Sequence, residues 1–376
     1  MKEITIGMVG FGFMGKMHTY GYKTIPLYYE DLPFGINLKW VCTSNEQTAK
    51  KAMERGGFDR YTTDFDDLIN DPDVDVIDIC TPNSLHKDEI IKALKAGKKV
   101  YCDKPLTVTY DEAKEVVETE KETGNIINQV TFHNRFYPAT IRAKKLVEDG
   151  KIGKVLTFEG KFLHSGNIDA NKGMNWKQDK EFGGGVLRDL GSHIIDILYH
   201  LMGEFDEVFC RTQNIRSVRL HKDGSMCDTP GEDSAYMSVM TKDGAVGNIT
   251  CTKIATGSDD ELSFAIYGEK GAIRFNLMDS NYLEYFDNTL PEEDLGGMRG
   301  FKRIQCVQRY EYPAGVFPSP KSSIGWTRGH VHCLYNFLDC VYNNKKPSPS
   351  FEEGAYVQYV MEKAYESADK NVSVKL

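Results

Sequence analysis

Two residues at helical spacing, Asp189 and His193, are the strongest candidates for acid–base chemistry. Apolar residues recur at 187, 190, 194, 198 and 201, which predicts a helix with one buried stripe. Residues four apart share a helix face, so the carboxylate and the imidazole can act on one group. An imidazole titrates near neutral pH and can remove a hydroxyl proton, which contributes about 10²- to 10⁴-fold as general base catalysis. A single histidine on a helix is also explained as a core residue. The residues around His193 must therefore show whether it is catalytic or structural.

A glycine-rich run near the N-terminus has the spacing of a dinucleotide-binding turn. It reads Gly10-Phe11-Gly12-Phe13-Met14-Gly15. Gly10 permits the tight turn, Gly12 lets the backbone approach a pyrophosphate, and Gly15 allows close packing of helix on strand. Because the run follows a strand pattern and opens a helix, we predict that it binds NAD or NADP.

The end of the second predicted strand bears on the choice between these cofactors. Thr43 and Ser44 stand there, where a carboxylate would favour NAD and an arginine NADP. Hydroxyl groups serve either cofactor, so the choice stays open.

The elements around these residues predict an α/β fold in two parts. The first 130 residues alternate short β-rich runs with helical stretches, which is typical of a Rossmann fold with a parallel sheet. The predicted strands are 4–9, 38–43, 60–62, 76–80, 99–102 and 126–130, with the clearest helices over 86–96 and 110–123. We therefore place a dinucleotide-binding domain at 1–131.

The remaining chain, 132–376, is predicted to be an α+β domain for substrate binding and oligomerisation. Longer alternating strands indicate a large, mostly antiparallel sheet. They span 155–162, 207–213, 233–241, 245–253, 262–267, 271–277 and 282–286, and helices over 330–343 and 352–369 close the chain. The segment 288–326, rich in Gly and Pro, reads as a long functional or interface loop rather than a core element.

The amino-acid composition limits the kinds of partner that the protein is expected to bind. The chain has 376 residues, 40% hydrophobic and 27% charged, and a net charge of −9, which argues against nucleic-acid binding through a general electrostatic field. No apolar run is long enough to span a membrane, and the N-terminus starts directly in a strand pattern without a signal peptide. Nine scattered cysteines fit reduced thiols and the cytoplasm. No ligand spacing predicts a metal, so we expect a small-molecule partner.

Three further runs follow the glycine motif in chain order. They are Cys80-Thr81-Pro82-Asn83-Ser84-Leu85-His86, Cys102-Asp103-Lys104-Pro105 and Gly183-Gly184-Gly185-Val186-Leu187-Arg188-Asp189-Leu190-Gly191-Ser192-His193-Ile194-Ile195-Asp196. With them, the sequence resembles the family of glucose-fructose oxidoreductase, inositol dehydrogenase and the rhizopine-catabolism proteins (Gfo/Idh/MocA). The resemblance covers nearly the whole chain.

The resemblance implies roles for individual residues. The turn Thr81-Pro82-Asn83, with His86 and Asp103, would lie along the cofactor. Lys104 would stand at the nicotinamide and the substrate, and Asp189 and His193 beside the reacting hydroxyl. All three would be catalytic and would contact substrate.

Two positions depart from the family pattern. Asp103 stands where the family usually has Glu, which puts the detailed positioning of Lys104 in question. Lys177 follows Trp176 where the family often has Arg, so a bidentate contact would be weaker.

Three other residues are candidates for substrate binding. Arg135 follows the sixth strand, where a parallel sheet presents its ligand-facing end. Asn175 and Trp176 precede the glycines at 183–185, and the indole could stack on the apolar face of a sugar ring. A core aromatic is the alternative for Trp176.

The leading interpretation is a dehydrogenase that oxidises a secondary hydroxyl of a sugar, a glycoside (at carbon 3) or a cyclitol, with hydride transfer to nicotinamide. Inositol 2-dehydrogenase is the nearest alternative within the family. A second alternative is an NAD-dependent glycosidase that oxidises its sugar transiently and eliminates the aglycone. A regulator without catalysis is disfavoured by the combination of Lys104, Asp189 and His193.

The second domain also predicts assembly. The strand 155–162 alternates Val155, Thr157, Glu159 and Lys161 on one face with Leu156, Phe158 and Phe162 on the other. A mixed face suits a subunit interface, so we expect a homodimer or homotetramer through this sheet, as the resemblance implies.

Overall fold

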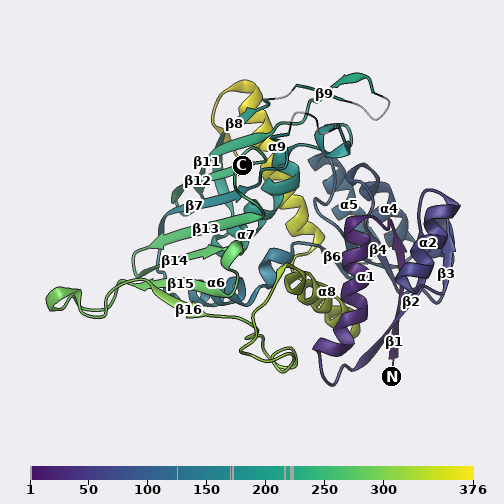
Figure 1. Cartoon of the computed structure of the whole chain (residues 1–376), viewed down its shortest axis with the longest axis horizontal. Helices are drawn as coiled ribbons and strands as arrows, with labels where there is room; N and C mark the ends of the chain where they lie inside the picture. The colour runs from purple at the N-terminus through teal and green to yellow at the C-terminus, as the bar shows by residue number, and fades with distance from the viewer. Residues whose placement is uncertain (1, 125, 170, 172, 216, 221–223) are drawn as a thin grey trace. The chain divides into compact units, whose positions relative to one another are not determined.

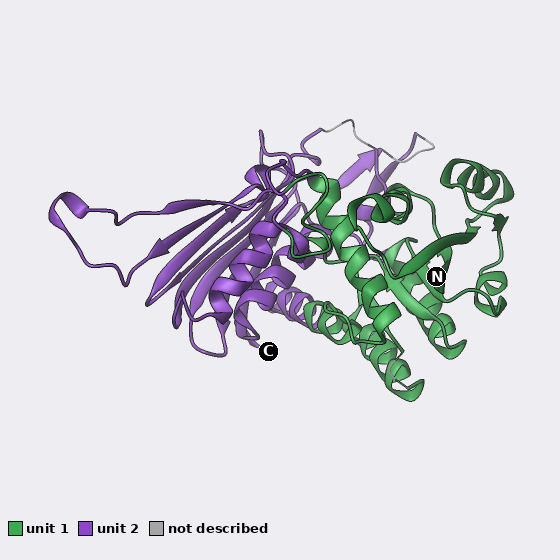
Figure 2. Ribbon diagram, turned by 90° about the horizontal axis from the view of Figure 1, so that it is seen from below, with its two compact units in different colours: residues 1–133, 310–319, 326–358 green, residues 134–309, 320–325, 359–376 purple. Residues whose placement is uncertain are grey.

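A computed structural model of the chain describes residues 2–124, 126–169, 171, 173–215, 217–220 and 224–376 (Figure 1). The chain divides into two compact units, coloured separately in Figure 2. Unit 1 consists of residues 1–133, 310–319 and 326–358, and unit 2 of residues 134–309, 320–325 and 359–376. Among the described residues, no helix has the length and apolar character that crossing a membrane requires.

Unit 1 contains a six-stranded parallel sheet in the order β3-β2-β1-β4-β5-β6. The strands are β1 (Lys2–Val9), β2 (Phe34–Cys42), β3 (Arg60–Thr62), β4 (Val76–Ile79), β5 (Lys99–Cys102) and β6 (Asn128–Val130). The order reverses between β1 and β4, which is the switch point where a Rossmann sheet binds its ligand. β4 is buried at every position, as expected for a parallel strand covered on both faces. The predicted Rossmann fold is confirmed.

The helices of unit 1 connect these strands. They are α1 (Phe13–Tyr28), α2 (Glu46–Gly56), α3 (Asp66–Asn70), α4 (Asn83–Lys95) and α5 (Tyr110–Glu122). The late helix α8 (Trp326–Asn343) packs on α1, and Gly21 permits the approach because a Cβ there would lie 2.8 Å from Leu334 Cδ2. The first part of α9 (Phe351–Lys370) also belongs to unit 1.

This membership differs from the predicted continuous domains. The division at His133 lies two residues after the expected boundary at 131, but α8 and the start of α9 return to the first unit. Their apolar faces pack there because contacts across the whole chain, not sequence proximity, decide where a helix is buried.

Unit 2 contains a nine-stranded sheet in the order β16-β15-β14-β13-β7-β12-β11-β8-β17. The strands are β7 (Val155–Leu163), β8 (Phe205–Gln213), β11 (Ser234–Thr241), β12 (Val246–Thr252), β13 (Glu261–Gly268), β14 (Gly271–Asn276), β15 (Tyr282–Asp287), β16 (Lys302–Gln305) and β17 (Val374–Lys375). All neighbours pair antiparallel except β12 and β7, so the predicted mostly antiparallel sheet is confirmed. A separate hairpin joins β9 (Val218–Leu220) and β10 (Met226–Asp228).

Helices cover one face of this sheet. α6 (Pro138–Glu148) packs on β14 and β15, and α7 (Ser192–Met202) packs on β7 and β13. Figure 2 shows these helices along one side of the purple strands. Phe158 and Phe162 of β7 are buried, whereas Thr157, Glu159 and Lys161 are exposed, as the predicted alternation requires. Leu156 is the exception, at 54% exposure.

Two predicted elements differ in the structure. The predicted helix 187–201 starts with a π-helical turn, Leu187–Gly191, before α7, and it is buried on most sides rather than along one stripe. The predicted loop 288–326 contains β16, which pairs with β15 at the edge of the sheet. The strand escaped prediction because an edge strand needs little apolar alternation, and only Ile304 of its four residues is half-buried.

Candidate functional site

The glycine turn between β1 and α1 has three glycines with different surroundings. Gly10 has φ +87°, and a Cβ there would lie 2.5 Å from the Cys80 carbonyl oxygen. A Cβ on Gly15 would lie 2.4 Å from the Gly10 carbonyl oxygen, whereas a Cβ on Gly12 would meet nothing within 4 Å. Gly12 is also the N-cap of α1 and brings no side chain to the helix end. This open, positively polarised helix end fits a dinucleotide pyrophosphate.

The end of β2 carries hydroxyl groups that take part in a helix cap. Thr43 Oγ1 lies 2.6 Å from Thr48 Oγ1 and donates to the Asn45 carbonyl oxygen at 3.2 Å. The Asn45 side chain caps α2 by accepting from the Thr48 amide, and Ser44 is exposed beside it. Ser44 and Thr43 thus stand at the sheet edge where the adenosine ribose of a Rossmann cofactor lies.

The turn after β4 is fixed by two side chains of α4. Thr81 Oγ1 donates to Glu89 Oε2 at 2.6 Å, and burial raises the pKa of Glu89 to about 7. The His86 ring is fully buried, with Nε2 3.0 Å from the Thr81 carbonyl oxygen and Nδ1 3.0 Å from that of Pro105. Burial lowers the pKa of His86, and a neutral ring can donate to only one of these carbonyls. His86 therefore connects the Thr81 turn to the Lys104-Pro105 segment.

Asp103 and Lys104 follow β5 at the same sheet edge. The Asp103 amide donates to the Ile79 carbonyl oxygen at 2.9 Å, and its Oδ1 is buried with no hydrogen-bond partner among the described residues. A buried carboxylate oxygen without a partner is costly unless a ligand satisfies it. Together with the open space at Gly12, it fits a bound dinucleotide.

Histidines and a tryptophan gather near Lys104 within unit 1. His133 stacks on His330 with 3.6 Å between ring centroids, and Trp326 lies 4.2 Å from His330. Burial, together with the charges of Lys104 and His18, lowers the pKa of His133 to about 3, so this ring is neutral at physiological pH. Lys104 thus lies near an aromatic cluster in which the His133 ring is neutral.

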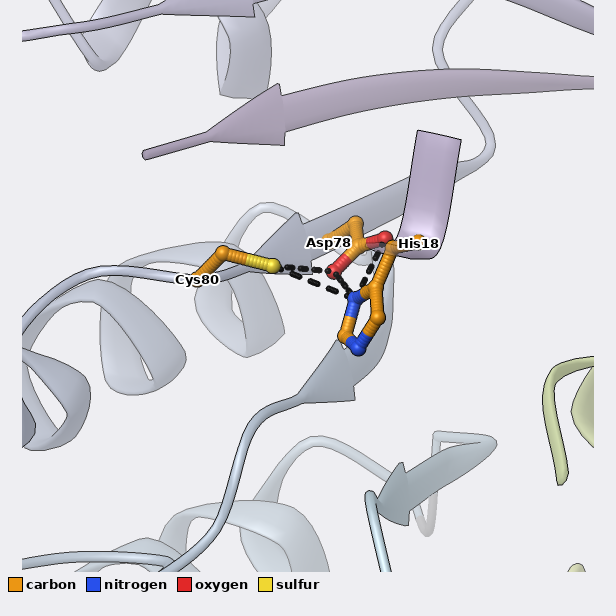
Figure 3. A group of neighbouring side chains, drawn as sticks. All are labelled: His18, Asp78 and Cys80. Carbon is orange, nitrogen blue, oxygen red and sulfur yellow. Dashed lines mark hydrogen bonds and ion pairs between the residues drawn. The ribbon is translucent and has the colours of Figure 1, made fainter. Parts of the chain in front are cut away.

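A buried cluster of His18, Asp78 and Cys80 joins α1 to the end of β4 (Figure 3). His18 Nδ1 lies 2.8 Å from Asp78 Oδ1 and 3.1 Å from Cys80 Sγ. Burial alone would lower the pKa of His18, but the Asp78 carboxylate raises it above its ordinary value. These residues could hold a metal by type, a possibility that sequence spacing did not indicate. Their donor atoms already bond to one another, so we interpret the cluster as a link between helix and strand.

In unit 2, Asp189 lies between two lysines. Lys253 Nζ is 2.5 Å from Asp189 Oδ2, and Lys177 Nζ is 3.1 Å from Oδ1. The Asp189 side chain is 15% exposed. His193, one turn later, is 6% exposed and packs against Phe162 with ring centroids 5.8 Å apart. The structure thus holds a carboxylate, two ammonium groups and an imidazole on neighbouring elements.

The turn that precedes Asp189 is held by the buried carboxylate of Glu232. Its Oε1 accepts from the Leu187 amide at 2.9 Å and from the Tyr365 hydroxyl at 2.8 Å. A Cβ on Gly185 would lie 2.6 Å from the same oxygen, so only glycine fits this close approach. Glu232 therefore sets where the π-helical turn, and with it Asp189, begins.

Three predicted substrate residues occupy different environments in unit 2. Asn175 caps a short 3₁₀ helix, Trp176–Gln178, by accepting from the Lys177 amide at 2.9 Å. Trp176 is 37% exposed, and Lys177 Nζ lies over its ring, 5.7 Å from the centroid. Arg135 is 3% exposed and bonds Asp196 through Nε at 2.9 Å. A buried, bidentate pair of this kind anchors α7, so the described contacts of Arg135 are structural.

Two family models match the chain. One, described as the oxidoreductase family NAD-binding Rossmann fold (GFO_IDH_MocA), matches residues 4–132, and the family's C-terminal alpha/beta domain matches residues 144–376. The chain belongs to the Gfo/Idh/MocA oxidoreductase family. The predicted family and the predicted nicotinamide-dependent oxidoreductase activity are confirmed, and residues 4–132 form an NAD-binding Rossmann fold.

Relatives of this Gfo/Idh/MocA oxidoreductase include sugar dehydrogenases. Levoglucosan dehydrogenase of Pseudarthrobacter phenanthrenivorans is 31% identical over 384 residues, covering 98% of this chain and 97% of that protein. A solved levoglucosan dehydrogenase in complex with NADH and levoglucosan superposes with a TM-score of 0.94 at 31% identity, covering 100% of this chain and 99% of that one. The scyllo-inositol 2-dehydrogenase (NAD(+)) of Bacillus subtilis is 27% identical over 272 residues, 72% of this chain and 73% of that protein.

Sequence reasoning missed two residues that organise the site of this oxidoreductase. Lys253 directly follows β12 and closed the predicted strand 245–253, so its position after an apolar alternation was an available signal. Glu232 lies two residues before β11 and showed no pattern. Both act through side-chain contacts with residues more than 40 positions away in the sequence, which no local spacing reveals.

Proposed function

We propose that this enzyme oxidises a secondary hydroxyl of a sugar, a glycoside or a cyclitol, with NAD as the hydride acceptor. The near full-length likeness to levoglucosan dehydrogenase, solved with NADH and levoglucosan, is the observation that carries the proposal. The Asp189 and His193 pair supports it, because hydride removal from a hydroxyl-bearing carbon requires that the hydroxyl proton be accepted.

In this proposal, different residues of the chain have different roles in the reaction. Bound NAD supplies the hydride acceptor, and the glycine turn, Thr43, Ser44, residues 81–83 and Asp103 hold it. The buried His86, predicted as a cofactor contact, instead fixes the turn at Thr81. His193 accepts the hydroxyl proton. Asp189 accepts a hydrogen bond from a neighbouring hydroxyl of the substrate and so orients the ring. Lys104 contributes a positive charge next to the nicotinamide and the substrate.

The proposal extends to substrate recognition. The half-exposed Trp176 stacks on the apolar face of a sugar ring, as an exposed indole can. Asn175 and Arg135 remain predictions as substrate residues. Among sugars, we favour oxidation at carbon 3 of a glycoside, and inositol 2-dehydrogenation is the alternative that the inositol-oxidising relative supports.

A substrate panel tests the proposal. Purified enzyme is incubated with levoglucosan, hexoses, alkyl and aryl glycosides and inositols, each with NAD and with NADP, and the formation of reduced cofactor is followed by absorbance. We expect reduced NAD to appear in proportion to a keto product. Release of aglycone without net reduction of NAD would instead establish an NAD-dependent glycosidase, and no reaction with any compound would refute the proposal.

We also propose that the enzyme assembles as a dimer or tetramer in the cytoplasm. The face of the unit 2 sheet opposite α6 and α7 carries exposed residues such as Val246, at 50%, and Tyr236, at 44%. A groove of 330 Å³ on this face is lined by Tyr267, Arg274 and Tyr282, among others. The arm between β15 and β16 extends from the sheet and exposes Leu295 and Met298 (Figure 1).

The proposed location in the cytoplasm is supported by the cysteines. All nine cysteines are free, which suits a reducing compartment.

A further inference from the structure

Lys253 is a buried lysine next to a carboxylate that the proposed reaction uses. It follows β12, its side chain is 11% exposed, and its Nζ lies 2.5 Å from Asp189 Oδ2. Its backbone is held on both sides, because its amide donates to the Asp233 carbonyl oxygen and its carbonyl accepts from the Asn167 amide, each at 2.9 Å. A lysine with a fixed backbone and little exposed surface has few alternative positions for its ammonium group.

Lys177 contacts the same carboxylate in a different setting. Its Nζ lies 3.1 Å from Asp189 Oδ1 and 3.2 Å from Oδ2, and its side chain is 44% exposed. Exposed ion pairs are worth little and exchange readily with water, whereas a charge-assisted bond in a buried site is stronger. Asp189 Oδ2 thus bonds the buried Lys253 as well as Lys177, whereas Oδ1 bonds the exposed Lys177, which exchanges readily with water.

Other charged groups around Asp189 are directed elsewhere. The Arg188 guanidinium lies over the Tyr365 ring, 5.1 Å from its centroid, and donates to the Gly184 carbonyl oxygen at 3.2 Å. The Glu232 carboxylate bonds Leu187 and Tyr365. His193 lies one helical turn further on. Among the described contacts of this carboxylate, Lys253 is therefore the buried cation.

We propose that Lys253 is a positioning residue of the reaction: it holds Asp189 ionised and in one orientation, with Oδ2 bound to the lysine and Oδ1 directed to a substrate hydroxyl. The inference rests on the proposed function, in which Asp189 orients the sugar through a hydroxyl next to the one whose proton His193 removes. In this arrangement the exposed Lys177 yields Oδ1 to that neighbouring hydroxyl when the sugar binds. The site therefore accepts a neutral polyol, whose hydroxyl donates one hydrogen bond to that oxygen.

The test compares Lys253→Met with Lys177→Met, which removes the exposed partner of the same carboxylate. We expect Lys253→Met to lower kcat about 10- to 100-fold, the range for a partner that orients a reacting group, and to move the acidic limb of the kcat profile to higher pH. Lys177→Met should act mainly on KM. Lys253→Arg, which keeps the charge, should restore the acidic limb. Lys242→Met, in an exposed pair with Glu204, is the matched control outside the site.

A kcat within about 3-fold of wild type and an unchanged pH profile in folded Lys253→Met would overturn the inference. A second measurement does not depend on activity or on that variant's folding. The carboxyl carbons of aspartate-labelled wild-type protein are titrated by NMR, with Asp189 assigned by its loss in Asp189→Asn. The proposal requires Asp189 to stay ionised below the ordinary aspartate range of about 3.9, and titration in or above that range would refute it. If the sugar panel fails but Asp189 titrates below the ordinary range, the proposed function fails, and what stands is an ionised Asp189 beside Lys253.

Discussion

At the scale of single residues, the proposed proton transfer depends on His193. The ring is almost fully buried and packs against Phe162, so its orientation is set by the core of unit 2 rather than by solvent. His200 lies on the same helix, but burial, with Arg135 and Lys144 nearby, lowers its pKa to about 2. It cannot take up a proton in the physiological range and provides a natural comparison.

We expect His193→Ala to lower kcat by at least about 10²-fold with little change in NAD affinity, because it removes a proton acceptor and not a cofactor contact. Steady-state kinetics and cofactor titration measure the two quantities. Added imidazole should restore part of the activity, and His200→Ala should retain most of it. Near-wild-type turnover of His193→Ala across the pH range would exclude His193 as the base.

Glu89 provides a prediction about stability. Its raised folded-state pKa of about 7, against 4.5 for an ordinary glutamate, means that the folded protein keeps a proton that the unfolded chain has lost. Stability therefore falls as pH rises from about 4.5 to 7 and then levels off. Glu89→Gln keeps the acceptor for Thr81 and should remove this loss, raising the free energy of unfolding by about 1–3 kcal/mol at pH 8 but not at pH 4. Denaturant unfolding of wild type and Glu89→Gln at pH 4 and pH 8 measures this difference. An equal change in the free energy of unfolding at the two pH values would contradict the prediction.

At the scale of elements, the turn between β1 and α1 separates folding from binding. A Cβ added to Gly10 would lie 2.5 Å from the Cys80 carbonyl oxygen, and one added to Gly15 would lie 2.4 Å from the Gly10 carbonyl oxygen. A Cβ added to Gly12 would meet nothing within 4 Å. The three glycines have the same sequence signature but different physical constraints. The packing of the turn requires Gly10 and Gly15, whereas Gly12 is required because the cofactor pyrophosphate approaches it.

We therefore expect Gly12→Val to abolish NAD binding while the melting temperature stays within a few degrees of wild type, because the side chain fills space that the pyrophosphate needs. Gly15→Val should lose stability as well, since its Cβ meets the Gly10 carbonyl oxygen. Calorimetric NAD titration and thermal melts separate the two effects. Gly300→Val, at another glycine whose Cβ would meet nothing within 4 Å, is the control. Undiminished NAD affinity in Gly12→Val would show that the glycine run is only a turn.

At the scale of the whole molecule, the open face of the unit 2 sheet is the candidate for self-association. Val246 pairs in register with Thr157 at the centre of this face, and Glu159 and Lys161 form an ion pair 3.0 Å long beside them. A face that mixes charge with exposed aliphatic groups is compatible with an isologous interface.

Light scattering should find a dimer or a tetramer at micromolar concentration. Val246→Asp should weaken the assembly, because it places a charge in the middle of the proposed interface. Leu295→Asp tests the arm in the same way. Leu27→Asp, at a residue 67% exposed on α1, introduces the same charge elsewhere and should leave the mass unchanged. A stable wild-type monomer would refute both the sheet interface and the role of the arm.

Sequence patterns alone were sufficient for the features that depend on local spacing. The alternation of strands and helices over the first 130 residues predicted the Rossmann sheet, because a buried parallel strand needs a continuous apolar run. The glycine run predicted its turn, because positive φ and close backbone approach admit almost no other residue. The ordered runs around Lys104 and Asp189 predicted the family, which the matches over 4–132 and 144–376 confirm.

Only the tertiary structure decided which groups surround those residues. It paired Lys253 with Asp189 and Arg135 with Asp196. It also brought the Glu232 carboxylate close to Gly185 and packed α8 against α1. It also added β16 to a sheet edge and a π-helical turn before α7. Each of these joins positions that are distant in sequence or depends on how tightly neighbours pack. A local pattern records which face of an element is buried, but not which side chain from elsewhere in the chain is buried against it.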